Sequence, residues 1–207
     1  MFMKKSSLSI KQISLIAIMS AIAAVLMVFD FPIVFIAPSF YRIDFSDLPC
    51  IIGSFALGPF CGAIMEILKI LIKLIIKPTS TVFVGELSNL LCGLSYVVIA
   101  GFIYNSHHNK KGALYSLIIS SVVSVIVSLF INYFISIPFY ANLYKISIEE
   151  IVKLGQLIFP LINSKATFVI SCVLLFNTIK MVIVSSITFI LYKKISPLVK
   201  KNSIYKQ

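Results

Sequence analysis

Charged side chains are scarce in this chain of 207 residues. Asp, Glu, Lys and Arg together make up 12% of it, whereas a soluble globular domain contains about 25%. Hydrophobic residues account for 59%, and the mean hydropathy is +1.05. So few charges cannot cover a surface in contact with water, which excludes a soluble enzyme or a soluble binding domain. We therefore predict an all-α integral membrane protein, built as a single membrane domain over residues 1–207.

The sequence also lacks the motifs of several kinds of chemistry. It contains no phosphate-binding loop of the Gly-x-x-x-x-Gly-Lys-Ser/Thr type, no His-Glu-x-x-His and no Gly-x-Ser-x-Gly. Its four cysteines fall in apolar runs without a Cys-x-x-Cys pair, which predicts neither disulfides nor metal ligands. We expect no enzymatic activity, no bound metal and no cofactor.

Acidic residues are the scarcer charges, seven against 18 basic residues, and the net charge is +11. In a soluble protein such an excess would suggest nucleic acid as a partner. Here the basic residues lie at the ends of apolar segments, as they do in membrane proteins whose topology follows the positive-inside rule. We expect the lipid bilayer, and no nucleic acid, around this chain.

Apolar runs long enough to cross a membrane recur along the chain. The first is followed by more hydrophobic sequence, which favours a retained helix over a signal peptide. A break at Gly58-Pro59 separates two further segments, because this dipeptide favours a turn and proline disrupts a helix. The six expected helices are residues 10–29, 48–57, 59–77, 80–104, 112–138 and 166–192.

Whether Gly58-Pro59 reverses the chain decides between five and six membrane spans. With six spans, the segments on one side hold ten lysines and no acidic residue, while those on the other side mix both signs. With five spans, the basic residues divide almost evenly. The positive-inside rule therefore favours six transmembrane helices with both termini in the cytoplasm.

Two outer segments carry further signals. Residues 30–47 are too rich in aromatic residues for free solvent, which predicts a structured first outer loop that packs on the membrane surface or covers a cavity. Residues 139–165 combine an apolar periodicity with charges on the opposite face. That pattern predicts a short helix at the membrane interface.

Five polar side chains within the apolar segments are candidates for a functional site, because such groups are expensive in a membrane. At about 1.5 Å per helical residue, they occupy the outer half of the membrane and reach just past its middle. This distribution predicts one cavity that opens outwards, with the last two of them near its floor. The five are Glu86, Asn89, Asn132, Asn177 and Lys180.

The alternative for such residues is structural, as hydrogen-bonding partners between helices. We favour that role for Asn89 taken alone. Glu66 and Lys69 are expected to form an internal ion pair, while Lys73 extends outwards. Lys180 differs because no acidic residue lies near it in the sequence, so water or a polar ligand would have to relieve the cost of its burial.

Beyond these patterns, the chain resembles a known family. The stretch FPIVFIAPSFYRIDFSDLPCIIGSFALGP is similar to the first outer loop and second helix of the riboflavin-specific membrane component of energy-coupling factor (ECF) transporters. Its most specific parts are DFSDLP and the following GP. FINYF and FNTIK, in the last two helices, continue the resemblance over nearly the whole chain.

The resemblance implies six helices in the bacterial cell membrane, with riboflavin bound in the outer half beneath the first loop. It also implies uptake driven by separate chains, a transmembrane subunit and two ATPase subunits that use ATP. By the resemblance, Asn132, Asn177 and Lys180 fall at positions that contact riboflavin. The small-residue motif that these components use for docking is matched by Ala17 and Ala21, and Ala24 extends it.

The chemistry of riboflavin suits the candidate residues independently. A carboxamide both donates and accepts hydrogen bonds, so it matches the imide edge of the ring. Asn177 and Lys180 can bind the polyhydroxyl tail, and a lysine would also tolerate the phosphate of flavin mononucleotide (FMN). The flat ring needs apolar and aromatic walls, for which the candidates are Phe40, Tyr41, Phe45 and Tyr133.

Three functions remain open at this point. The first is a substrate-binding component that needs an ATPase module, for riboflavin, FMN or a related vitamin. The second is a stand-alone secondary carrier, which usually shows an inverted repeat, and the sequence has no such repeat. The third is an intramembrane enzyme with Glu66 or Glu86 as its acid or base, for which no second catalytic group is apparent. The resemblance favours the first.

Overall fold

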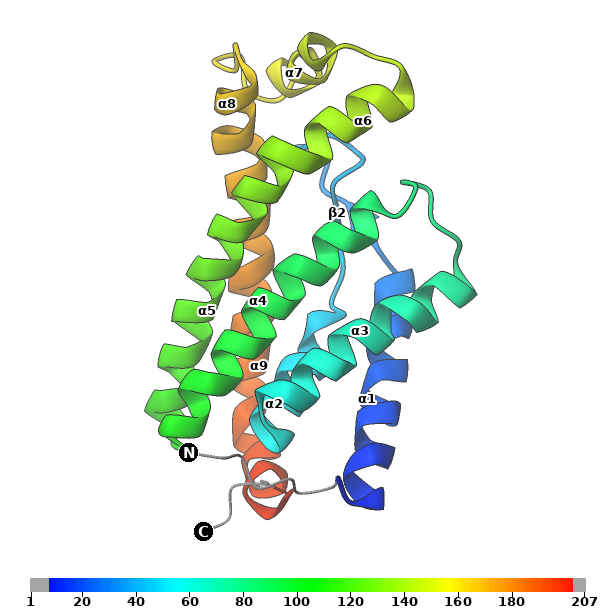
Figure 1. Ribbon diagram of the computed structural model, residues 1–207. Coiled ribbons are helices and arrows are strands. Elements are labelled where there is room, and N and C mark those ends of the chain that lie inside the picture. Colours follow the sequence, from blue (N-terminus) through cyan, green and yellow to red (C-terminus); the bar gives the residue numbers. More distant parts are fainter. Residues whose placement is uncertain (1–7, 203–207) are drawn as a thin grey trace.

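The computed structural model describes the backbone of residues 8–202 and the side chains of residues 8–192. It is a bundle of helices with a short antiparallel ribbon on the segment between the first two (Figure 1). The elements in chain order are α1 (Ile10–Val28), β1 (Phe31–Pro32), β2 (Arg42–Ile43), α2 (Asp47–Leu57), α3 (Pro59–Ile76), α4 (Val84–Ser106), α5 (Lys110–Ile131), the π-helix η1 (Asn132–Ser136), α6 (Ile137–Tyr144), α7 (Ile148–Gln156), α8 (Lys165–Phe168), the π-helix η2 (Val169–Val173) and α9 (Leu174–Asn202).

The helices run alternately between two ends of the bundle. One end holds the α2–α3 and α4–α5 turns and the start of α1, and the other holds the ribbon and α6 to α8 (Figure 1). Gly58 and Pro59 do reverse the chain. Gly58 has φ = 95°, a conformation that glycine adopts without strain, and Pro59 begins α3.

Four helical segments of the described chain are long and apolar enough to cross a membrane. α2 has 11 residues, and α3 carries a run of charged side chains. The protein is therefore a membrane protein with several apolar helices, while the count of six spans stays a prediction. The four segments are Ile10–Val28, Val84–Ser106, Lys110–Tyr144 and Lys165–Tyr192.

The first three expected helices match the structure to within one residue at each end. α1 begins after Ser9, whose side chain forms a reciprocal capping box with Gln12. α7 begins with the same device, Ser147 with Glu150. This short helix lies in the segment where an interfacial helix was expected, residues 139–165.

Three expected boundaries are wrong. The helix expected from residue 80 begins at Val84, because residues 80–83 form a turn in which Val82 and Phe83 have positive φ. The helix expected to end at Pro138 continues to Tyr144. The wider turn of η1 precedes Pro138, whose ring would otherwise meet the carbonyl four residues earlier. α9 continues past residue 192 to Asn202.

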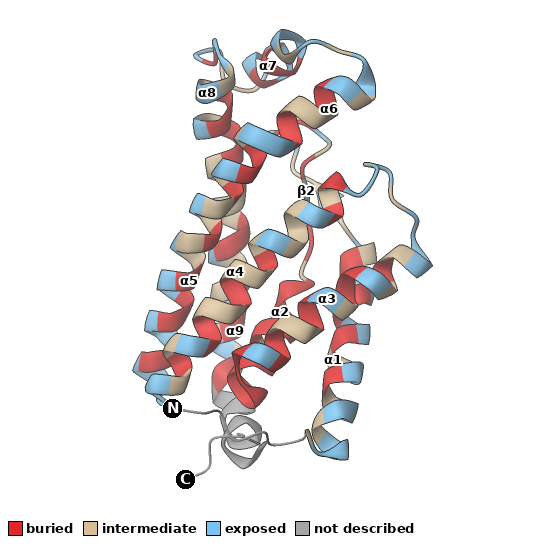
Figure 2. Cartoon of the chain, in the orientation of Figure 1, coloured by how far each residue is buried: buried red, intermediate tan, exposed pale blue. Residues whose placement is uncertain are grey.

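Buried side chains form two apolar clusters at different heights in the bundle. One joins α1 to α5 with the later part of α9, and the other joins the α1–α2 segment, α6, α7 and the start of α9. Along α9, Phe176 belongs to the second cluster and Met181 to the first. Lys180 lies between these two residues, at the level where the clusters meet along α9. Figure 2 shows that exposed residues follow the outward faces of the helices.

Candidate functional site

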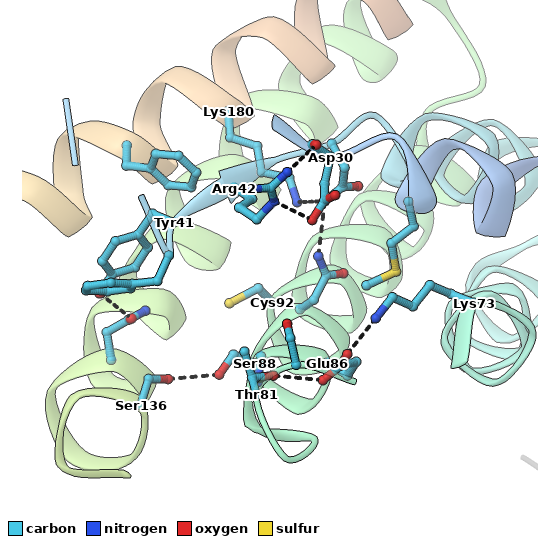
Figure 3. A pocket seen from close by; sticks show the side chains of 18 of the residues that line it. Asp30, Tyr41, Arg42, Lys73, Thr81, Glu86, Ser88, Cys92, Ser136 and Lys180 are labelled. Atoms are coloured by element: carbon cyan, nitrogen blue, oxygen red, sulfur yellow. Dashed lines mark hydrogen bonds and ion pairs between the residues drawn. The ribbon is translucent and has the colours of Figure 1, made fainter. Parts of the chain in front are cut away.

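A cavity of about 440 Å³ opens where the two apolar clusters meet. The α1–α2 segment, the end of α3, the first half of α4, η1, α6 and α9 all contribute to its wall (Figure 3). It therefore lies at the end of the bundle that holds the ribbon. Its position agrees with the expectation of a cavity on the side of the first loop.

Two asparagine amides lie in the wall formed by the widened helices. The Asn132 Oδ1 accepts a hydrogen bond of 2.8 Å from the Tyr41 hydroxyl, and its Nδ2 donates to the Ser128 carbonyl. The Asn177 Nδ2 donates to the Val173 carbonyl at 2.9 Å. Each amide thus has one donor fixed on its own helix and keeps hydrogen-bonding capacity for the cavity.

Aromatic rings form the wall beside these amides. Tyr41 packs on Phe40, with ring centroids 4.8 Å apart, and on Phe176 at 5.6 Å. Phe40 packs in turn on Tyr140. All four residues line the cavity. The α1–α2 segment therefore supplies rings that pack on α6 and α9 and help to close one side of the cavity.

Lys180 does have acidic partners, in contrast to the expectation from its sequence neighbours. Its Nζ lies 3.4 Å from Asp44 Oδ2 and 3.1 Å from Asp47 Oδ2. Both partners come from the end of the α1–α2 segment and the start of α2. Asp44 also accepts hydrogen bonds from Asn89 at 3.3 Å and from the backbone and side chain of Ser46. These contacts fix the carboxylate that faces the lysine.

A second buried lysine lies behind this pair. Lys69 Nζ is 2.8 Å from Asp47 Oδ1 and 2.5 Å from Glu66 Oε2, which confirms the expected Glu66–Lys69 ion pair. Both side chains are fully buried and do not line the cavity. The ions come from α2 and α3, so they connect these helices to the cavity floor.

Lys73 does not extend outwards as expected. It is buried, and its Nζ lies 2.6 Å from Glu86 Oε1. Thr79 and Thr81, in the turn between α3 and α4, donate hydrogen bonds to the other oxygen of Glu86. Glu86 therefore joins α3, α4 and their connecting turn at the cavity wall, as Figure 3 shows for Lys73, Thr81 and Glu86.

A more exposed group of ions lies on the α1–α2 segment at the wall of the cavity. The Asp30 carboxylate pairs with Arg42 and with Lys77, each at 2.8 Å. Partial burial would raise the pKa of Asp30, but its hydrogen bonds to Lys77 and Arg42 and their positive charges outweigh that effect and lower it. Asp30 thereby ties the ribbon to the ends of α1 and α3.

The structure brings most of the expected binding residues together. Phe45 and Tyr133 stand apart from the cavity lining. Phe45 packs on Phe31, and the Tyr133 ring lies beneath the Lys165 ammonium at 4.2 Å. The expected residues that line the cavity are Phe40, Tyr41, Glu86, Asn89, Asn132, Asn177 and Lys180.

The expected docking residues of α1 divide between two faces. Ala17 and Ala21 are exposed, whereas Ala24 is fully buried against the bundle. A partner helix can therefore reach the first two positions but not the third.

Several lining residues were not predicted as members of the site, although some lie within the stretches that carry the family resemblance. Phe176 precedes Asn177 and resembles any apolar residue of a membrane helix. Arg42 lies in the short strand β2 and Asp44 directly after it, in the segment between α1 and α2, where charged residues are ordinary. The lining residues not foreseen include Arg42, Asp44, Ser88, Ser136, Tyr140 and Phe176.

Comparison with known proteins gives a consistent match. Residues 11–192 match the family described as "ECF transporter, substrate-specific component". A solved structure described as the S component of a bacterial ECF transporter superposes with a TM-score of 0.72 at 29% identity, covering 92% of this chain and 98% of the other.

Curated relatives span almost the whole chain. The chain is 29% identical to the riboflavin transporter RibU of Staphylococcus aureus, over 92% of this chain and 93% of the relative. It is 26% identical to the riboflavin transporter FmnP of Bacillus subtilis, over 94% and 96%. It is 30% identical to RibU of Leuconostoc mesenteroides, over 93% and 94%.

Proposed function

Because this chain belongs to the family of ECF transporter substrate-specific components, we propose that it binds riboflavin and delivers it for uptake. The family is one of transporter components, so the chain is not an enzyme. The observation that supports riboflavin best is the cavity, in which aromatic rings and two amides occur together. The curated relatives that match nearly the whole chain are named as riboflavin transporters.

The proposed pose follows from the chemistry of the wall. The flat ring lies against Phe40, Tyr41 and Phe176, because apolar and aromatic surfaces are what a buried ring system needs. The amide of Asn132 faces the imide edge, which offers both donors and acceptors. Asn177 and the Lys180 ammonium bind hydroxyls of the tail.

The energy for uptake comes, in this proposal, from a separate transmembrane subunit and two ATPase subunits. The absence of a phosphate-binding loop from the sequence agrees with that division of labour. The proposed topology is multi-pass in the bacterial cell membrane, with the cavity outwards and both termini cytoplasmic. Riboflavin is the cargo, and we propose no resident cofactor for this chain.

Titration of the purified protein with riboflavin, without ATP, tests the proposal. We expect one riboflavin per chain, with flavin fluorescence quenched by the aromatic rings that contact it. FMN added as a competitor measures whether the cavity accepts a phosphate beside Lys180. Absence of both quenching and heat of binding, together with clear binding of another vitamin, would refute riboflavin as the substrate.

A further inference from the structure

The floor of the cavity rests on a buried carboxylate that serves two lysines. Asp47 Oδ1 lies 2.8 Å from Lys69 Nζ, and Asp47 Oδ2 lies 3.1 Å from Lys180 Nζ. Lys180 lines the cavity, whereas Asp47 and Lys69 do not. Asp47 therefore links a lysine that the substrate cannot touch to one that it can.

The position of the Lys180 ammonium depends on two competing attractions. Asp44, which lines the cavity, is 3.4 Å away, and Asp47, behind the floor, is 3.1 Å away. Lys69 binds one oxygen of Asp47 and balances part of its charge, which limits the pull of Asp47 on Lys180. Charges interact strongly in a buried site, so a change in this balance moves the ammonium.

We propose that Lys69 is a positioning residue for the substrate site, which sets through Asp47 where Lys180 presents its ammonium to the cavity. The inference rests on the proposed function, because riboflavin binding is its readout. Without Lys69, Asp47 turns both oxygens towards Lys180. The ammonium then leaves Asp44 and withdraws from the cavity, and the substrate loses a hydrogen-bond donor.

Glu66 offers a matched control on the same helix. It is as fully buried as Lys69, and its Oε2 lies 2.5 Å from the same ammonium. Within the described residues, its ion pair is with Lys69, and none joins it to Lys180. Glu66→Gln leaves Lys69 with Asp47 as its one carboxylate partner among these ions, so Lys69 balances the charge of Asp47 at least as well as before and the pull of Asp47 on Lys180 does not increase. We therefore expect riboflavin affinity not to fall by more than about twofold.

A double-mutant cycle tests the connection. Lys69→Met is made in the native protein and in a background that lacks the floor pair, Asp44→Asn with Lys180→Met. Riboflavin Kd and melting temperature are measured for all four proteins. We expect Lys69→Met to weaken binding about tenfold in the native background. In the background without Lys180 it should change Kd by less than about twofold, because no ammonium remains to be misplaced.

If Lys69→Met weakens riboflavin binding by the same factor in both backgrounds, Lys69 is a structural residue and the proposal is overturned. Unchanged affinity of Lys69→Met in the native background would also overturn it. Equal weakening by Glu66→Gln would also overturn it. If Lys69→Met does not fold, the double variant Glu66→Gln with Lys69→Met takes its place, because it removes both members of an ion pair and keeps the net charge constant. We expect it to weaken riboflavin binding in the native background and not in the background without Lys180. If the native protein binds another vitamin and not riboflavin, the proposed function fails, and the cycle is run with that vitamin.

Discussion

At the scale of single residues, Asn132 is the position at which a role in ligand binding can be distinguished most clearly from a role in holding the helices together. Its side chain bonds to the Tyr41 hydroxyl and to a carbonyl of its own helix, and it faces the cavity. Hydrogen bonds between neighbouring helices in membranes are individually weak. A ligand group left unpaired in a closed site costs more, about 1–3 kcal/mol.

Asn132→Ala should therefore weaken riboflavin binding by a factor of about 5 to 150, with little change in melting temperature. Asn142→Ala, at an exposed position of α6, is the control and should leave both quantities unchanged. Fluorescence titration and thermal unfolding measure the two effects. An unchanged Kd with a sharply lower melting temperature would instead assign Asn132 to the packing of the helices.

Asp30 gives a prediction about pH. Its folded-state pKa lies below its unfolded value of about 3.9, because Lys77 and Arg42 stabilise the carboxylate despite its partial burial. A lowered folded-state pKa adds stability that is fully present above the unfolded pKa and is lost as the pH falls through the folded pKa. The group is partly exposed, so the gain is modest, in the range of about 0–1 kcal/mol.

We expect the melting temperature of the native protein to be slightly higher than that of Asp30→Asn at every pH above about 5. This difference in melting temperature should shrink as the pH falls below about 4. Melting temperatures measured across this range test the expectation. In a protein that also carries Arg42→Gln and Lys77→Gln, Asp30→Asn should change the melting temperature little at every pH. A difference between native protein and Asp30→Asn that grows in acid would contradict the ion-pair explanation.

At the scale of elements, the turn between α3 and α4 stores strain beside the cavity. Val82 has φ = 47°, a left-handed conformation that is rare for a β-branched residue. Its neighbours hold it there: Thr79 accepts hydrogen bonds from the backbone of Thr81 and Phe83, and both threonines donate to Glu86. The contacts of Glu86 thus fix a turn that Val82 alone would not adopt.

Val82→Gly should therefore stabilise the protein. Relief of the left-handed strain is worth about 1–2 kcal/mol, and the greater freedom of glycine in the unfolded chain removes about 0.5–1 kcal/mol of it. Val34→Gly is the control, because Val34 is an exposed loop valine outside the set of positive-φ residues, and it should destabilise. A lower melting temperature for Val82→Gly would show that the contacts of the valine side chain stabilise the protein by more than the strained backbone destabilises it.

How well the sequence predicts an element depends on whether its ends are encoded locally. The starts of α1 and α3 were predictable, since a long apolar run marks the first and Gly58-Pro59 marks the second. The end of α6 was not, because Pro138 normally ends a helix and the π-turn before it is a property of packing. A proline alone therefore predicted the wrong boundary.

The residues that line the cavity show the same division. Asn132, Asn177 and Lys180 were identifiable because polar side chains are conspicuous in apolar helices. The carboxylate partners of Lys180 were not, since Asp44 lies 136 positions away in the sequence and nothing in the sequence pairs it with the lysine. Only the fold brings the α1–α2 segment down to the level at which α9 carries its lysine.

At the scale of the whole molecule, buried ions lie where two apolar clusters meet. One cluster joins α1 to α5 and the later part of α9, and the other includes the aromatic wall. Ions of α2 and α3 connect the cavity floor to helices that pack against α1. The substrate and a partner bound to α1 would therefore both act on α2 and α3.

Docking of a partner on α1 is the prediction that belongs to this scale. The helix buries one face against its own bundle and exposes Ala17 and Ala21 on another. Small side chains allow a second helix to approach closely, and such packing is a main source of association between helices in lipid. Ala24 is fully buried, so it belongs to the internal contact and not to the docking surface.

Ala17→Trp or Ala21→Trp should leave riboflavin binding by the isolated protein unchanged and abolish ATP-dependent uptake when the transmembrane and ATPase subunits are supplied. The bulky ring occupies the space that the partner helix needs, whereas lipid around the free protein adapts to it. Ile118→Trp, at an exposed position of α5, is the control and should retain both activities. Loss of binding together with uptake would place the two alanines inside the fold, and uptake that survives both substitutions would place the docking surface on another helix.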